Sequence, residues 1–227
     1  MEIQITQDLV QKKSITPNDA GCLQYIEDFL TQRGFINETL TFGRVKNLWS
    51  VKRNNGPLLV FLGHVDVVPT GPENEWEHDP FSGHDDGTFI NGRGTGDMKG
   101  GIACFMSALS RIDVDSLNYS IGFLITADEE GPSKDGTVKV VEELLQRNEK
   151  IDYCLIGEPS TLETVGDNIR IGRRGSINIE LEVLGKQGHA AYPARVDNPI
   201  HKVVPFLDKL LKEVWDEGNE HFPPTSL

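Results

Sequence analysis

Three short runs of apolar residues are separated by segments with helical periodicity, and this alternation limits the possible folds most. The runs lie at residues 58–62, 121–125 and 153–156. Apolar runs of this length without polar alternation are typical of strands that are covered on both faces. Strands that alternate with helices indicate an α/β domain with a mainly parallel or mixed sheet flanked by helices.

Four segments carry apolar residues at helical spacing. We expect helices at residues 17–33, 99–111, 137–147 and 199–214. Thr16 and Pro17 are suited to the start of the first helix, and Gly34 is suited to its end.

The pattern changes near Gly175. Apolar and polar residues alternate over residues 176–184, which predicts a strand with one solvated face, as in an antiparallel sheet. We therefore expect a catalytic α/β domain over residues 1–175. Residues 176–227 would begin an α+β lid or dimerisation domain.

The charge balance excludes several partners. The chain has 22 Lys and Arg against 35 Asp and Glu, which gives a formal net charge of −13. Nucleic acids and anionic membrane surfaces select basic patches, so we expect neither as a partner. No apolar run approaches the roughly 18 residues of a membrane-spanning helix.

The compartment is predicted from the start of the chain and from its cysteines. Residues 1–10 have neither a basic nor an apolar signal region, so we expect no signal peptide. Cys22, Cys104 and Cys154 are odd in number and widely spaced. We expect Cys104 and Cys154 to be buried free thiols. This cysteine usage favours a reducing compartment, the cytoplasm.

Ionisable residues follow each apolar run. His64 and Asp66 follow the first run, residues 128–130 are Asp-Glu-Glu after the second, and Glu158 follows the third. Ligands of open α/β sheets bind beyond the carboxyl ends of the strands. Carboxylates gathered there raise each other's pKa, and a bound divalent cation removes that conflict. The sequence therefore predicts a metal site.

Each element also has a simpler interpretation when it is taken alone. His64 could be an ordinary hydrogen-bonded histidine, Glu129 and Glu130 a solvated acidic turn, and Glu158 a cap. Their joint occurrence at three predicted strand ends favours a metal. His64 and Asp66 face the same way on an extended chain, so Asp66 can accept the second imidazole N–H.

A glycine-rich segment at residues 91–101 precedes the second predicted helix. Its spacing fits neither common phosphate-binding pattern, GxGxxG or GxxxxGKS. We expect instead that this turn brings the Asp97 carboxylate into the same crevice.

Together these motifs resemble the di-zinc aminoacylase/carboxypeptidase family of metallohydrolases. The matching segments are residues 63–69, 76–81, 92–100, 128–130 and 157–160. The resemblance implies two zinc ions per full-length subunit, with cobalt as a possible substitute. His64, Asp97 and Glu158 would hold one zinc, and Asp97 would bridge to a second zinc that Glu130 also holds.

The resemblance also implies catalytic roles. Asp66 would orient the imidazole ligand, and Glu129 would act first as general base and then as general acid. His189 would donate a hydrogen bond to the oxyanion in the partner subunit of a homodimer.

Later motifs narrow the expected substrate. Residues 172–176, 185–193, 198–202 and 222–227 resemble bacterial family members that remove succinate from N-succinyl-LL-2,6-diaminopimelate, a small molecule of lysine and diaminopimelate biosynthesis. Arg173, Arg174 and Tyr192 would bind that substrate. The two arginines could equally be a surface basic pair.

Two other functions stay open. One is a related metallo-aminoacylase or dipeptidase. The other is a non-catalytic metal-binding fragment, because the family's last zinc ligand is a distant downstream histidine. His201 and His221 match lid positions instead. We therefore expect this chain to be an N-terminal fragment.

Overall fold

A computed structural model describes residues 1–170, 172, 175, 177 and 179–226. It divides into two compact units, Met1–Asp167 and Asn168–Leu227. The assignment of residues 1–175 to a catalytic domain and of 176–227 to a lid stays a prediction.

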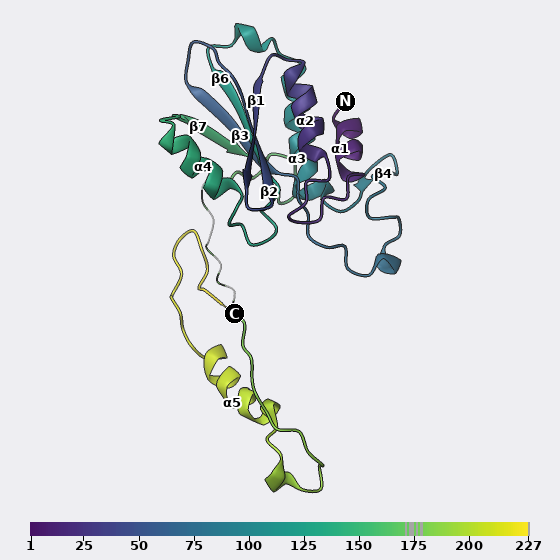
Figure 1. Ribbon diagram of the computed structural model, residues 1–227, viewed down its shortest axis with the longest axis vertical. Helices are drawn as coiled ribbons and strands as arrows, with labels where there is room; N and C mark the ends of the chain where they lie inside the picture. Colours follow the sequence, from purple (N-terminus) through teal and green to yellow (C-terminus); the bar gives the residue numbers. More distant parts are fainter. Residues whose placement is uncertain (171, 173–174, 176, 178, 227) are drawn as a thin grey trace. The chain divides into compact units, whose positions relative to one another are not determined.

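The first unit is built on a five-stranded mixed sheet (Figure 1). In spatial order its strands are β1 (Ile36–Phe42), β2 (Val45–Lys52), β6 (Ser120–Thr126), β3 (Leu58–His64) and β7 (Tyr153–Ile156). β3 runs parallel to both β6 and β7, whereas β2 is antiparallel to β1 and β6. The predicted α/β class with a mixed, partly parallel sheet is confirmed.

Helices cover both faces of this sheet. The first face is covered by α1 (Glu2–Val10), α2 (Cys22–Thr31) and α3 (Gly100–Leu109), and the second face by α4 (Thr137–Gln146). Successive side chains of β6 point to opposite faces of the sheet. Phe123 and Ile125 pack with α1–α3, and Leu124 packs with α4. This explains why the run 121–125 has no polar residue.

Short elements join the main ones. They are β4 (His84–Asp85), which pairs with β5 (Ile90–Asn91), single turns at Glu73–Glu75 and Val114–Ser116, and a kinked turn at Thr95–Lys99 directly before α3.

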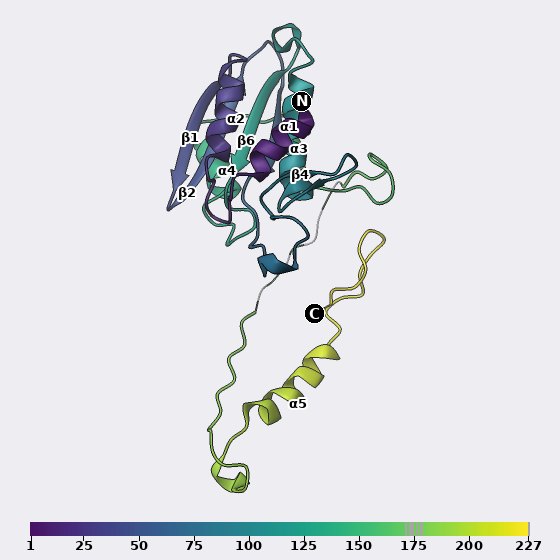
Figure 2. The same cartoon turned by 90° about the vertical axis from the view of Figure 1, so that its right-hand side faces the viewer.

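The second unit contains a turn at Pro193–Arg195 and the helix α5 (Pro199–Leu211), drawn in yellow-green in Figure 2. Asn198 begins α5 by accepting the N–H of Ile200 on its side chain. None of the α5 residues, all of them described, is buried. Its apolar residues, such as Leu211 at 71% exposure, face solvent.

Several local predictions are wrong. The first predicted helix begins at Cys22 rather than Pro17, because Ala20 and Gly21 have positive φ angles (47° and 83°) that a helix does not contain. No strand lies within residues 179–184, since no described segment pairs with them there. Ser176 and Asn178 lie outside the described residues.

The third apolar run forms a strand, but its side chains are not buried. β7 is an edge strand of the described sheet, and Tyr153, Leu155 and Ile156 are exposed. Cys154 on this strand and Cys104 on α3 are also exposed, so the prediction that these thiols are buried is wrong.

Among the described residues, no helix combines the length and the apolar character that crossing a bilayer requires.

One buried cation ties α1 to the turn before α3. Lys99 is fully buried, and its Nζ donates hydrogen bonds to the main-chain oxygens of Leu9 (2.9 Å) and Lys12 (3.0 Å). These oxygens lie at the carboxyl end of α1, where the helix dipole favours a positive charge. Lys99 therefore fixes the last turn of α1 against the segment that carries Asp97.

We expect Lys99→Met to lower the free energy of unfolding by about 1–3 kcal/mol, because two buried carbonyls lose their donor. Urea denaturation measures this change. Lys139→Met on the surface of α4 is the matched control and should leave the midpoint almost unchanged. Equal midpoints for the two variants would contradict the tethering role.

Candidate metal centre

The carboxyl ends of three neighbouring strands deliver the predicted ligands. β3 ends at His64, β6 leads into Glu129 and Glu130, and β7 leads into Glu158. Asp97 reaches the same place from the kinked turn Thr95–Lys99. The parallel alignment of β6, β3 and β7 explains why residues so distant in sequence meet at one edge.

His64 is the buried centre of this cluster, with 1% of its surface exposed. Its Nδ1 lies 2.9 Å from the main-chain oxygen of Asp66 and 3.6 Å from the Asp66 carboxylate. A carbonyl oxygen only accepts, so Nδ1 carries the hydrogen. In the neutral imidazole the lone pair is therefore on Nε2.

Nε2 faces carboxylate oxygens. It lies 3.0 Å from Asp97 Oδ1, 3.5 Å from Glu158 Oε1 and 3.9 Å from Glu129 Oε2. A lone pair and carboxylate oxygens at these distances repel each other, unless a proton or a metal cation lies between them. The geometry thus selects for a cation at Nε2.

The ligand atoms form two overlapping groups that share His64. One consists of His64, Asp97 and Glu130, and the other of His64, Glu129 and Glu158. Within each group the ligand atoms all lie within 4.8 Å of one another. The division predicted from the resemblance, with Glu158 and Asp97 on one ion and Glu130 on the other, stays a prediction.

The electrostatics reflect this crowding. Burial would lower the pKa of His64, but its contacts with Asp66 and Glu158 raise that pKa to about 11. Burial and the nearby Glu158 charge raise the pKa of Asp97. Burial, with Glu158 and Asp97 close by, also raises the pKa of Glu129. Without a metal, the cluster therefore retains protons.

Asp66 connects the histidine to the acidic loop. Its buried carboxylate accepts the main-chain N–H groups of Glu129 (3.1 Å) and Glu130 (3.1 Å). Burial opposes its ionisation, but His64 and the Glu129 N–H lower the pKa of Asp66 below its usual value. Asp66 therefore stays charged and holds the start of this loop beside His64.

Asp128 holds the acidic loop together, a structural role that its residue type and position did not predict. Its buried carboxylate accepts the N–H groups of Ser133 (3.3 Å), Lys134 (2.9 Å) and Asp135 (3.0 Å). These hydrogen bonds close the loop that presents Glu129 and Glu130. The Asp-Glu-Glu sequence does not by itself distinguish the first carboxylate, which stabilises the loop, from the two that the loop presents.

The remaining predicted residues lie in the second unit or outside the described part. His189 and Tyr192 are exposed residues of the second unit, and their rings are 5.8 Å apart. The His189 Nδ1 accepts the N–H of Ala191 (3.1 Å). Arg173 and Arg174 lie outside the described residues, so their roles stay predictions.

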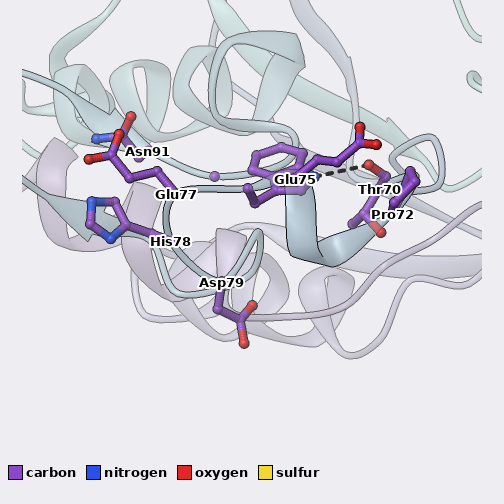
Figure 3. A pocket seen from close by; sticks show the side chains of 9 residues that line it. Thr70, Pro72, Glu75, Glu77, His78, Asp79 and Asn91 are labelled. Carbon is purple, nitrogen blue, oxygen red and sulfur yellow. Dashed lines mark hydrogen bonds between the residues drawn. The ribbon is translucent and has the colours of Figure 1, made fainter.

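A separate cavity of about 340 Å³ lies in the loops between β3 and α3 (Figure 3). Thr70 and Pro72 lie at one end of the view, and Glu77, His78 and Asn91 at the other. Its lining, taken over the described residues, includes none of the metal-cluster side chains. The candidate metal-binding cluster and this cavity are therefore distinct features.

The chain is similar to several curated proteins along nearly its whole length. Two are proteins called succinyl-diaminopimelate desuccinylase, from Hydrogenovibrio crunogenus (53% identical) and Marinobacter nauticus (52% identical). Each match covers 99% of this chain and 60% of the relative. The chain thus spans about 60% of the length of these relatives.

Solved structures share the fold at lower identity. Human carnosine dipeptidase 1 is 20% identical with a TM-score of 0.63, over 70% of this chain and 38% of that one. The Saccharomyces cerevisiae dipeptidase Dug1p is 15% identical with a TM-score of 0.62, over 96% of this chain and 50% of that one. These similarities support the α/β fold.

A family model for peptidase family M20/M25/M40 matches residues 60–226, which include all the candidate ligands. The match begins within β3 and continues through α5. The chain therefore belongs to peptidase family M20/M25/M40.

Proposed function

We propose that this chain provides the metal site of a zinc-dependent amide hydrolase that removes succinate from N-succinyl-LL-2,6-diaminopimelate, in lysine and diaminopimelate biosynthesis. The observation that carries the hydrolase is the orientation of His64, whose Nε2 faces carboxylates from three segments. The substrate rests on the relatives about 50% identical to this chain.

The donor set fits a divalent metal. It combines one imidazole, held by its other nitrogen, with several carboxylates, which is a set that zinc accepts. In the proposal His64, Asp97 and Glu158 hold one zinc, and Asp97 and Glu130 hold a second. Cobalt could replace zinc, since such a set also binds other divalent ions.

The proposed chemistry is hydrolysis of the succinyl amide. A bound divalent ion would lower the pKa of a water molecule and polarise the carbonyl group of the substrate. Glu129 accepts a proton from water as the oxygen adds to the carbonyl carbon. It then returns the proton to the amine nitrogen as the C–N bond breaks, which releases succinate and the free amine. The raised pKa of Glu129 suits a group that must both take and return a proton.

Residues of the second unit complete the proposal. His189 would donate a hydrogen bond to the oxyanion in the partner subunit of a homodimer. Its Nδ1 already accepts the Ala191 N–H, so the neutral ring carries its hydrogen on Nε2, where it can be donated. Tyr192 and the arginines Arg173 and Arg174 would bind the substrate, the arginines through its carboxylates. We place the enzyme in the cytoplasm.

Zinc binding should release protons, because His64 must lose the proton that its pKa of about 11 implies. The affinity should therefore rise with pH through the neutral range, by about tenfold per pH unit for each proton released. Calorimetry in buffers of different ionisation enthalpy measures the release.

His201→Asn, at an exposed position, should release as many protons as the unchanged chain, whereas His64→Asn should bind zinc much more weakly. An affinity that is independent of pH between pH 6 and pH 8 would argue against this site.

Glu129→Gln should leave zinc affinity close to that of the unchanged protein and lower kcat by about 10²–10⁴-fold, since the proton acceptor is lost. Hydrolysis of the succinyl substrate by the purified protein gives kcat. Glu142→Gln, on the exposed surface of α4, is the control and should retain full activity. Normal turnover by Glu129→Gln would remove Glu129 from the mechanism.

The substrate is tested by comparing kcat/KM for N-succinyl-LL-2,6-diaminopimelate, N-acetyl amino acids and dipeptides on the same preparation. We expect the succinyl substrate to be preferred by at least about tenfold. A substrate without the succinyl carboxylate would leave an arginine of the binding site unpaired, which costs more than about 1.4 kcal/mol, the free energy that corresponds to a factor of ten. Preference for an acetyl amino acid or a dipeptide would make the protein an aminoacylase or a dipeptidase. Zinc binding without hydrolysis of any of the three would make the chain a metal-binding module.

A further inference from the structure

Met98 lies at the meeting point of three segments that carry candidate ligands. It follows Asp97 in the chain, yet its own side chain is 1% exposed, whereas 54% of the Asp97 side chain is exposed. The two neighbours therefore point in different directions, one to the cation site and one to the core beneath it.

The sulfur of Met98 takes a hydrogen bond from a ligand's main chain. The His64 N–H lies 3.3 Å from Met98 Sδ. The next N–H, of Val65, donates to Thr126 on β6, so the His64 N–H faces the β7 side. On that side the last bond of the ladder is from Gly157 N–H to Leu62 O (3.1 Å). The Met98 sulfur thus accepts a hydrogen bond from the first main-chain N–H of β3 that lies beyond its last hydrogen bond with β7.

The terminal methyl group of Met98 occupies the space that side chains on two glycines of neighbouring strands would need. A Cβ on Gly63 would lie 2.7 Å from Met98 Cε, and a Cβ on Gly157 would also lie 2.7 Å from it. These glycines directly precede His64 and Glu158. The methyl group therefore packs directly against the main chains of two neighbouring strands, each of which carries a candidate ligand.

The start of α3 closes the third side. A Cβ on Gly101 would lie 2.4 Å from the main-chain oxygen of Gly157, so α3 and the end of β7 are in close contact here. Met98 is enclosed by this contact and by Phe61 and Ile102 of the core. It has little freedom to shift without moving a ligand segment.

We propose that Met98 is a positioning residue of the metal centre, whose thioether sets the spacing of His64, Asp97 and Glu158 and thereby the affinity for the metal. This inference rests on the proposed metal site, but it assigns a role to a side chain that would not itself touch the ion.

The first test replaces Met98 with leucine, which conserves volume but removes the acceptor and branches the side chain. Met106→Leu is the matched control, since Met106 is also fully buried in the same core and lies on α3. Zinc affinity is measured on the full chain by competition with a chromophoric chelator.

We expect Met98→Leu to raise the zinc Kd about tenfold, as is typical when a residue that orients a ligand is changed. Met106→Leu should change the zinc Kd by no more than about twofold. In the metal-free chain the two variants should shift the melting temperature by similar amounts. The visible spectrum of bound Co²⁺ should change for Met98→Leu only. An unchanged Kd for Met98→Leu, or equal weakening by the two variants, would overturn the proposal.

A second variant and a metal-free measurement keep the test decisive. Gly63→Ala retains Met98 but displaces its methyl group, so we expect a comparable loss of zinc affinity. In the metal-free chain, amide hydrogen exchange at His64 should be faster in Met98→Leu than in Met106→Leu. If the unchanged chain binds no zinc, the proposed function fails. Equal exchange rates at His64 would show separately that Met98 does not hold this strand end.

Discussion

The structure around the candidate metal centre depends on one hydrogen bond, from His64 Nδ1 to the main-chain oxygen of Asp66. This bond fixes the imidazole tautomer and turns the Nε2 lone pair toward carboxylates. The resulting arrangement is unfavourable without a positive charge at Nε2. Without a metal a proton can supply that charge, which agrees with the direction in which the contacts with Asp66 and Glu158 shift the pKa of His64. A divalent cation would satisfy the same arrangement and relieve the carboxylates as well.

Asp66 extends this constraint to the loop that carries Glu129 and Glu130. Its main-chain oxygen holds the histidine, and its carboxylate holds the N–H groups of Glu129 and Glu130. One residue therefore fixes the relation between a candidate ligand and the candidate proton acceptor. Although Asp66 is buried, His64 and the Glu129 N–H lower its pKa. This carboxylate therefore stays charged at pH values where Asp97 and Glu129, whose pKa values are raised, are protonated.

The sequence predicted the strands that form the site more accurately than the elements around them. Continuous apolar runs identified β3, β6 and β7, and the residues that follow them identified His64, Glu129 and Glu158. The hairpin of β1 and β2 was missed, because residues such as Asn37, Lys46 and Asn47 interrupt its apolar pattern. α1 was missed as well, because it is only nine residues long and its N-cap, Met1, makes no side-chain hydrogen bond that would mark its start.

Met98 shows why the rest of the site could not be predicted from residue types. A methionine in an apolar helix pattern is ordinary core, and glycines before His64 and Glu158 are consistent with simple turns. Their roles become apparent only when the ends of β3 and β7 are seen to pack against the same methyl group. The ligand types follow from the chemistry of the metal, but their separation follows from packing beneath them. In this chain the separation is set by a side chain with no charge and no lone pair aimed at the ion.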